Sequence, residues 1–95
     1  MIKEKKNFYI NGEWVNPYQT NDLEVVDPSN EEICAIISLG SENDTNDAVK
    51  AARNSFESWW NTPKEKKLEL LNNLLKIYIN RSAEMAEAIS KEMGA

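Results

Sequence analysis

The amino-acid sequence predicts an α+β segment in which two pairs of strands, each resembling a β-hairpin, precede three helical segments. Two observations carry this prediction. Short apolar stretches separated by turn residues occupy the part of the chain before Gly40, as strands do. After Gly40, apolar residues recur at intervals of three and four, which is the period of a helix that buries one side.

The first strand pair is centred on Asn11-Gly12, with residues 8–10 before it and residues 13–15 after it. Asparagine and glycine both tolerate the positive φ that a two-residue type I′ turn requires, so we expect a tight hairpin here. The lysines within residues 3–6 are interleaved with a glutamate. They predict a solvated tail, and a patch for an anionic ligand is the alternative interpretation.

The second strand pair comprises residues 23–26 and 33–37, separated by the sequence Asp-Pro-Ser-Asn at residues 27–30. Proline presets φ in such a turn, and the side chains of Asp, Ser and Asn bond to nearby backbone groups. Residues 33–37 are apolar at every position, so we expect this strand to be covered on both faces. Cys34 lies within it and is predicted to be a small core residue.

The first helix follows the polar residues 41–45, which supply N-cap side chains and place acidic charge at the helix start. A calcium loop beginning at Glu42 is the alternative interpretation. It is disfavoured because its sixth and twelfth places lack the required glycine and glutamate. The apolar residues of this helix recur at helical spacing: Ala48, Val49, Ala52, Phe56, Trp59 and Trp60.

Two further helices are expected after residue 61. Residues 62–65 predict a capping box, in which the Thr62 side chain caps the second helix and the Glu65 side chain bonds back to the Thr62 backbone. A proline then occupies the first helical position. Residues 80–82 predict a break, and Gly94 suits the end of the third helix. The lysines at the start of the second helix predict a solvated face. The apolar stripes of these two helices are Leu68, Leu71, Leu75 and Tyr78, with Leu70, Leu74 and Ile77 beside them, and then Met85, Ala86, Ile89 and Met93.

Composition and charge exclude several classes of protein. The chain carries a net charge of −5, and nucleic-acid binding requires a basic face, so we expect no nucleic-acid partner. No stretch approaches the ~20 apolar residues of a membrane span, so we expect no membrane partner either. The single cysteine excludes an internal disulfide, and no apolar run follows the first charged residues. We therefore predict a cytoplasmic location.

The sequence offers no catalytic, cofactor-binding or metal-binding residue. It contains no histidine, the commonest general base near neutral pH and the commonest metal ligand. A reactive thiolate needs a cationic or helix N-terminal setting, whereas Cys34 lies in an apolar strand. The three glycines are too far apart to form a phosphate-binding loop. Trp59 and Trp60 predict helix packing, and a ligand platform is the alternative.

The predicted helices have more apolar surface than the two strand pairs can cover. This imbalance indicates that residues 1–95 belong to something larger. The alternative is a small acidic interaction module without enzymatic activity, which docks its apolar helix face on a partner.

Four stretches follow one another in a recognisable order: residues 9–15, residues 25–33, residues 47–56 with Trp59, and residues 92–95. Together they resemble the N-terminus of the NAD(P)-dependent aldehyde dehydrogenase superfamily. In that family an "INGEWV"-like hairpin precedes a "V-N-P-x-x-G-E" turn, an "A-V-x-A-A-R-x-A-F-x-x-W" helix and a helix ending near "E-x-G". Asp27 replaces the usual asparagine, and Asn30 or Glu31 stands where the turn glycine usually sits.

The resemblance implies that a longer protein oxidises an aldehyde to a carboxylic acid. In the family a cysteine thiolate attacks the carbonyl, hydride passes to NAD or NADP, and water hydrolyses the thioester. None of the family's catalytic or dinucleotide-binding residues matches a position here, so this segment alone is expected to be inactive and to bind no cofactor. Some members bind a monovalent cation through carbonyls that match Val25 and Val26, but we assign no metal site.

The resemblance also implies a place within the fold. Residues 1–95 correspond to the N-terminal portion of the α/β, Rossmann-like cofactor-binding domain, before its dinucleotide-binding and catalytic regions. The expected partner is the remainder of the same polypeptide, and the longer protein is expected to be a homo-oligomer. Neither the aldehyde nor the choice between NAD and NADP follows from these residues.

Overall fold

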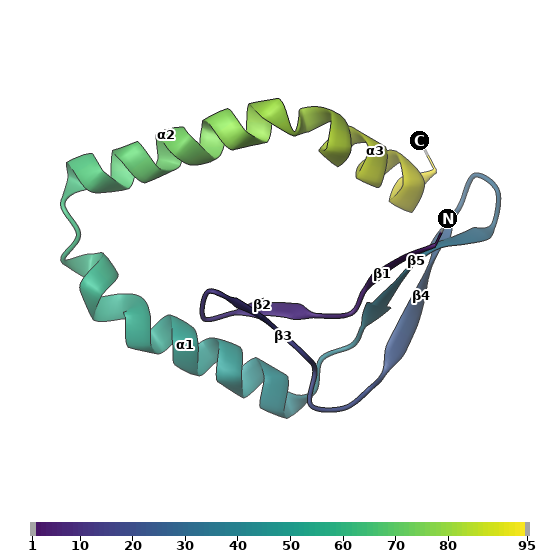
Figure 1. Ribbon diagram of the computed structural model, residues 1–95, viewed down its shortest axis with the longest axis horizontal. Helices are drawn as coiled ribbons and strands as arrows, with labels where there is room; N and C mark the ends of the chain where they lie inside the picture. Colours follow the sequence, from purple (N-terminus) through teal and green to yellow (C-terminus); the bar gives the residue numbers. More distant parts are fainter. Residues whose placement is uncertain (1, 95) are drawn as a thin grey trace.

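The computed structural model describes residues 2–94. Strands come first and helices second, so the α+β prediction is confirmed (Figure 1). The strands and helices together form an open arch (Figure 1). The elements are β1 (Lys3–Lys5), β2 (Phe8–Ile10), β3 (Glu13–Val15), β4 (Asp22–Asp27), β5 (Glu32–Ser38), α1 (Glu42–Trp60), α2 (Lys64–Asn80) and α3 (Ser82–Met93).

The strands form a hairpin and a separate three-stranded sheet. The hairpin pairs β2 with β3, and the sheet has the order β1-β5-β4, with β5 antiparallel to β4 and parallel to β1. Strand β1 was not predicted, because Lys3, Glu4 and Lys5 show no apolar alternation. It forms because the apolar β5 offers a free edge, and its side chains stay exposed, as expected of a solvated tail.

Both predicted strand turns are present. Asn11 and Gly12 have φ values of 55° and 77°, as a type I′ hairpin turn requires, so that prediction is confirmed. In the β4–β5 turn, the Asp27 carboxylate accepts bonds from the Ser29 backbone N–H at 2.9 Å and from the Ser29 hydroxyl at 2.6 Å. Glu31 closes the turn with a φ of 61°, in the left-handed region.

A register shift interrupts the β4–β5 ladder at Cys34. Val25 faces Ala35 and Val26 faces Ile33, so Cys34 has no opposite residue. Its thiol instead donates to the Val25 carbonyl oxygen at 3.4 Å. Cys34 and the other apolar residues of β5 are half-buried. The expected burial of this strand on both faces is therefore incomplete among residues 2–94.

Helix α1 begins as predicted. Ser41 is the N-cap, its hydroxyl accepts a bond from the Asp44 N–H at 3.3 Å, and the Asp44 carboxylate accepts one from the Ser41 N–H at 2.8 Å. This reciprocal pair satisfies two backbone donors that would otherwise lack partners. The interpretation of residues 42–47 as a helix start is confirmed.

The capping box predicted at residues 62–65 is wrong. The N-cap of α2 is Pro63, which makes no side-chain cap bond, and the Thr62 hydroxyl donates backward to the Ser58 carbonyl oxygen at 2.8 Å. The Thr62 N–H also bonds back, to the Trp59 carbonyl oxygen at 3.1 Å. Thr62 therefore completes the last turn of α1 and cannot also cap α2.

Helix α3 packs its C-terminal end against the β4–β5 turn. The predicted break is present, because α2 ends at Asn80 and α3 begins at Ser82. Gly94 ends α3 with a φ of 72°. A Cβ atom at Gly94 would lie 3.1 Å from the Pro28 Cβ and 3.2 Å from the Ser29 nitrogen. Gly94 thus allows both the left-handed cap and the close approach to the turn.

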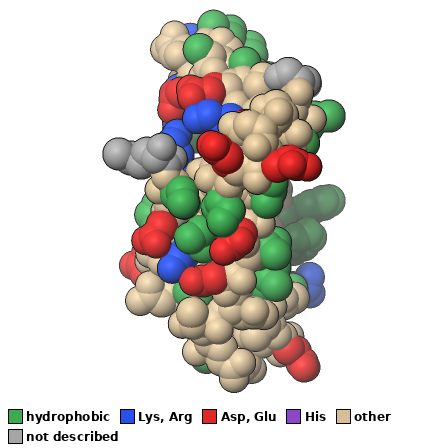
Figure 2. All heavy atoms as spheres, turned by 90° about the vertical axis from the view of Figure 1, so that its right-hand side faces the viewer, with side chains coloured by type: hydrophobic (Ala, Val, Ile, Leu, Met, Phe, Trp, Pro, Cys, Tyr) green, Lys and Arg blue, Asp and Glu red, His purple; other side chains and the backbone are tan. Residues whose placement is uncertain are grey.

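No apolar side chain is fully buried anywhere in residues 2–94, so the described segment has no closed core. Its radius of gyration is 17.0 Å, against about 12 Å for a compact domain of this length. Hydrophobic side chains are open to solvent at the end of the arch shown in Figure 2, between acidic ones. The predicted stripes of all three helices remain exposed, with Val49, Leu71 and Met93 each more than half exposed.

Candidate functional site

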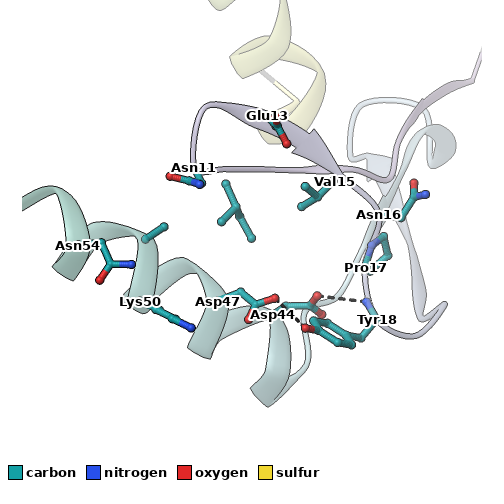
Figure 3. Close-up of a pocket in the computed structure, with 12 residues that line it drawn as sticks. Asn11, Glu13, Val15, Asn16, Pro17, Tyr18, Asp44, Asp47, Lys50 and Asn54 are labelled. Carbon is teal, nitrogen blue, oxygen red and sulfur yellow. Dashed lines mark hydrogen bonds between the residues drawn. The ribbon is translucent and has the colours of Figure 1, made fainter.

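A cavity of about 620 Å³ lies between the β2–β3 hairpin, the connection from β3 to β4, and α1 (Figure 3). The hairpin contributes Ile10 and Val15, and the connection contributes Tyr18. Acidic side chains from the first turns of α1 lie opposite Tyr18, and Lys50 and Asn54 follow farther along the helix (Figure 3).

Asp44 ties the β3–β4 connection to α1. The Asp44 residue is 6% exposed, and its carboxylate accepts bonds from the Tyr18 N–H at 3.1 Å and from the Ser41 hydroxyl at 2.9 Å. The Ser41 backbone N–H, the Ser41 hydroxyl and the Tyr18 N–H lower the pKa of Asp44, and partial burial opposes them. Asp44 is thus an anionic anchor between two segments that are distant in sequence.

Tyr18 makes a second bond across the same cavity. Its phenol donates to an Asp47 carboxylate oxygen at 2.8 Å, one turn beyond Asp44 (Figure 3). This bond, followed by the negative charge of Asp47, raises the pKa of Tyr18, which stays a neutral donor near neutral pH. The three side chains position α1 against the connection.

Cys34 lines a different, smaller cavity. This cavity of about 250 Å³ lies between the sheet and α3, and it also contains Lys3, Lys5 and Lys91. The Lys91 ammonium forms an ion pair with the Glu87 carboxylate at 2.9 Å. The Val25 carbonyl oxygen accepts a hydrogen bond from the Cys34 thiol at 3.4 Å. Within residues 2–94, no three His, Cys, Asp or Glu side chains are grouped in a way that holds a metal ion.

The two tryptophans predicted to pack contact side chains of α1 and α2. Trp60 stacks on Phe56, with ring centroids 6.1 Å apart, and the ammonium of Lys67 lies 5.2 Å from the Trp59 ring centroid. Trp60 is nevertheless 72% exposed. Trp14 meets Tyr9 edge to face across the hairpin, at 5.1 Å. Trp14 lies on β3, whereas Trp59 and Trp60 lie on α1, and no ring contact joins Trp14 to either of them within residues 2–94.

The Tyr18–Asp44–Asp47 cluster was not predicted. Residues 41–47 indicated a helix start, and Ser41 and Asp44 have the spacing of a capping box. That spacing accounts for the bonds between Ser41 and Asp44. Tyr18 carries no such signal, because only the folded hairpin brings it to α1.

The model of the aldehyde dehydrogenase family matches residues 14–95. The chain belongs to this family. It is 40% identical over 94 residues to a 3-succinoylsemialdehyde-pyridine dehydrogenase from a Pseudomonas species, covering 99% of this chain and 20% of that protein. It is 39% identical over 87 residues to a putative aldehyde dehydrogenase of Staphylococcus epidermidis, covering 92% of this chain and 18% of that protein.

Two solved aldehyde dehydrogenases share the fold of this segment. The structure from Bartonella henselae superposes with a TM-score of 0.96 at 47% identity, covering 98% of this chain and 20% of that one. Aldehyde dehydrogenase C of Pseudomonas syringae, solved as a variant with NAD⁺ and octanal, gives a TM-score of 0.92 at 39% identity over 95% of this chain and 19% of that one. The chain therefore spans about a fifth of the length of these relatives.

Proposed function

We propose that residues 1–95 form the N-terminal, structural segment of an aldehyde dehydrogenase that oxidises an aldehyde to the carboxylic acid with NAD or NADP. The observation that carries the proposal is the agreement between this arch and a fifth of a solved aldehyde dehydrogenase, at a TM-score of 0.96. The relative solved with NAD⁺ and octanal supports a nicotinamide cofactor and an aldehyde substrate.

We infer that the segment by itself binds no dinucleotide. Its glycines lie in a hairpin turn, in the β5–α1 connection and at the end of α3, so they form no continuous loop for phosphate groups. We therefore propose that cofactor binding and chemistry reside in the remainder of the longer polypeptide. Residues 1–95 would form the outer part of its cofactor-binding domain and support it by packing.

The interaction-module alternative gains no specific support, whereas the family match extends over residues 14–95. Homo-oligomeric assembly of the longer protein and its cytoplasmic location stay predictions. In the structure, none of the helices within residues 2–94 combines the length and apolar content of a bilayer span.

A chimeric enzyme tests the proposal. Residues 1–95 replace the matching segment of the Pseudomonas syringae aldehyde dehydrogenase, in its unmutated form, and octanal-dependent reduction of NAD⁺ is measured. We expect the chimera to retain activity within about tenfold of the parent, because the segment supplies only packing contacts. A folded chimera of native size without activity would contradict the proposal.

The isolated chain provides the complementary measurement. We expect no aldehyde-dependent reduction of NAD⁺ or NADP⁺ by purified residues 1–95, because they supply no general base and no dinucleotide loop. Turnover that survives repurification and persists in Cys34→Ser would show that the chain contains catalytic parts that we have not identified.

A further inference from the structure

The turn residues Asn11 and Gly12 are both exposed at the tip of the β2–β3 hairpin. Asn11 borders the 620 Å³ cavity described above and a second cavity of about 400 Å³, which Tyr9 and Ser55 also line. Among residues 2–94, a Cβ atom on Gly12 would have no heavy atom within 4 Å except those of its chain neighbours. Water therefore reaches both the side-chain amide of Asn11 and the backbone nitrogen of Gly12.

These two groups can react with each other. The Gly12 nitrogen attacks the Asn11 Cγ and forms a bond to it, while the Cγ–Nδ2 bond breaks and ammonia leaves with the proton of the Gly12 amide. Water then opens the cyclic imide that results. Attack of water at Cγ leaves aspartate, whereas attack at the backbone carbonyl carbon leaves isoaspartate, whose main chain runs through Cβ and Cγ.

The type I′ turn holds the reacting atoms apart, and a related turn brings them together. Type I′ sets the ψ of its first central residue near about +30°, which points the following nitrogen away from the side chain. Type II′ has the same φ there but a ψ of about −120°, which brings that nitrogen beside the Cβ atom of an L-residue. Rotation of the single peptide plane between Asn11 and Gly12 converts one turn into the other. The Ile10–Glu13 pair stays in place, because both turns join two-residue hairpins.

Glycine at position 12 permits this rotation. Its φ, 77° in the structure, must become negative in the type II′ turn, and glycine adopts either sign without steric cost. Asn11 is strained in the type II′ turn, so that state is sparsely populated. We propose that Asn11 is a site of spontaneous conversion to aspartate and isoaspartate, reached by this peptide rotation within the folded hairpin.

The other asparagines lack this combination and serve as internal controls. Asn11 is the only asparagine that a glycine follows. Asn54 is also exposed and lines the same 620 Å³ cavity, but it lies within α1, where helical hydrogen bonds fix the backbone on both sides. The Asn30 side chain is held in place, because it accepts a bond from the Glu32 N–H at 2.9 Å.

Both products change the hairpin where it meets α1. Aspartate at position 11 adds negative charge to a cavity that Glu13, Asp44 and Asp47 already line. Isoaspartate lengthens the main chain of the turn by one atom, so a two-residue turn no longer matches the present register, which pairs Ile10 with Glu13. The reaction is therefore a one-way change of the hairpin that accumulates after synthesis.

The test incubates the chimera described above at constant pH and temperature in water labelled with heavy oxygen. Samples are digested in ordinary water, and mass spectrometry measures the label in each asparagine-containing peptide, so conversion during digestion is not counted. Chromatography separates aspartate from isoaspartate. We expect Asn11 to convert at least about tenfold faster than Asn54 or Asn30, because only Asn11 precedes a glycine. Equal rates at Asn11 and Asn54 would overturn the proposal.

Tyr9→Ala distinguishes rotation within the hairpin from opening of the hairpin. It removes the contact with Trp14, whose ring centroid lies 5.1 Å from that of Tyr9, and Tyr9 is 62% exposed, so its loss leaves no internal void. Opening as the route would raise the Asn11 rate about fivefold or more, and this would overturn the proposed route. We expect a change of less than about twofold, because the turn residues are unaltered. In the control Asn11→Gly, which also accepts positive φ, the same peptide should gain no label.

Discussion

Glu31 adopts a backbone conformation that glutamate rarely takes. Its φ of 61° lies in the left-handed region, where a Cβ atom approaches the following carbonyl oxygen. The strain persists because the Glu31 N–H is held by the Asp27 carbonyl oxygen at 2.8 Å and the Asp27 side chain holds Ser29. Among the two positions that the family comparison left open for the usual glycine, Glu31 is the one with positive φ.

Glu31→Gly is therefore expected to stabilise the turn. Glycine adopts positive φ without steric cost but gains entropy in the unfolded chain, so we expect a net gain of about 0.5–1 kcal/mol. Thermal unfolding of the chimera measures it. Asn30→Gly is the control and should destabilise, because the Asn30 side chain accepts a bond from the Glu32 N–H at 2.9 Å. Stabilisation by Asn30→Gly alone would contradict the assignment.

Asp44 makes the attachment of α1 sensitive to acid. Its pKa is lowered below the ordinary 3.8 in the folded state by the N–H and hydroxyl of Ser41 and by Tyr18. A depressed folded-state pKa contributes stability that is complete above the unfolded-state value and is lost as the pH falls through the folded-state value.

Asp44→Asn should consequently lower the melting temperature of the chimera most at about pH 6. The difference should shrink as the pH falls below 3.8 towards the lowered folded-state pKa, where the wild-type carboxyl becomes protonated in the folded state too. Comparing the two melting temperatures across this range cancels the titration of all other carboxylates. A constant difference at every pH would assign the effect of Asp44 to packing alone.

At the scale of elements, the two long helices are capped by different means. Helix α1 has a reciprocal pair of bonds between Ser41 and Asp44, whereas α2 begins at a proline that makes no side-chain bond. The corner between them is instead held by the Thr62 hydroxyl on Ser58 and by Lys67 over Trp59.

Ser41→Ala and Thr62→Ala should differ accordingly. Loss of the Ser41 cap is expected to cost about 1 kcal/mol of unfolding free energy. Thr62→Ala removes one exposed bond to a carbonyl of its own helix and is expected to cost at most a few tenths of a kcal/mol. Urea unfolding of the two chimeric variants separates these values. If Thr62→Ala lowered the unfolding free energy more than Ser41→Ala, the result would favour the capping role of Thr62 that the sequence pattern predicted.

The elements that were predictable from sequence are those specified by neighbouring residues. The Asn11-Gly12 turn, the Ser41 helix start and the left-handed Gly94 each depend on the backbone preferences of one to four residues. Strand β1 and the Tyr18–Asp44 bond escaped prediction because their partners lie 32 and 26 positions away. The error at Thr62 arose because two helix ends competed for one hydroxyl.

Across residues 2–94 the molecule is an arch without a closed core, and this determines how the isolated chain should behave. Burial of one leucine side chain contributes roughly 1.5–3 kcal/mol, and ordinary domains are stable by only ~5–15 kcal/mol. Because the apolar stripes of the helices stay exposed, the isolated chain lacks a large part of the hydrophobic stabilisation that a domain needs. We expect isolated residues 1–95 to be partly molten or self-associating.

Hydrogen exchange and sedimentation on the isolated chain measure this directly. The expected result is rapid amide exchange in α2 together with concentration-dependent association, because nothing within residues 2–94 covers that helix. A monomer with slowly exchanging amides both in residues 25–37 and in residues 68–78 would contradict the prediction and favour an independent interaction module.

The parallel pairing of β1 with β5 has a consequence for synthesis on the ribosome. Lys3–Lys5 leaves the exit tunnel first, yet its partners, Ala35–Ile37, follow 32 residues later, so the sheet is completed only after the hairpin has formed. The helices emerge next, and under the proposed function their leucines would face water until the remainder of the longer polypeptide is translated. Because exposed apolar surface makes a nascent chain prone to aggregation, we expect its yield in a cell to depend on elongation speed as well as on final stability.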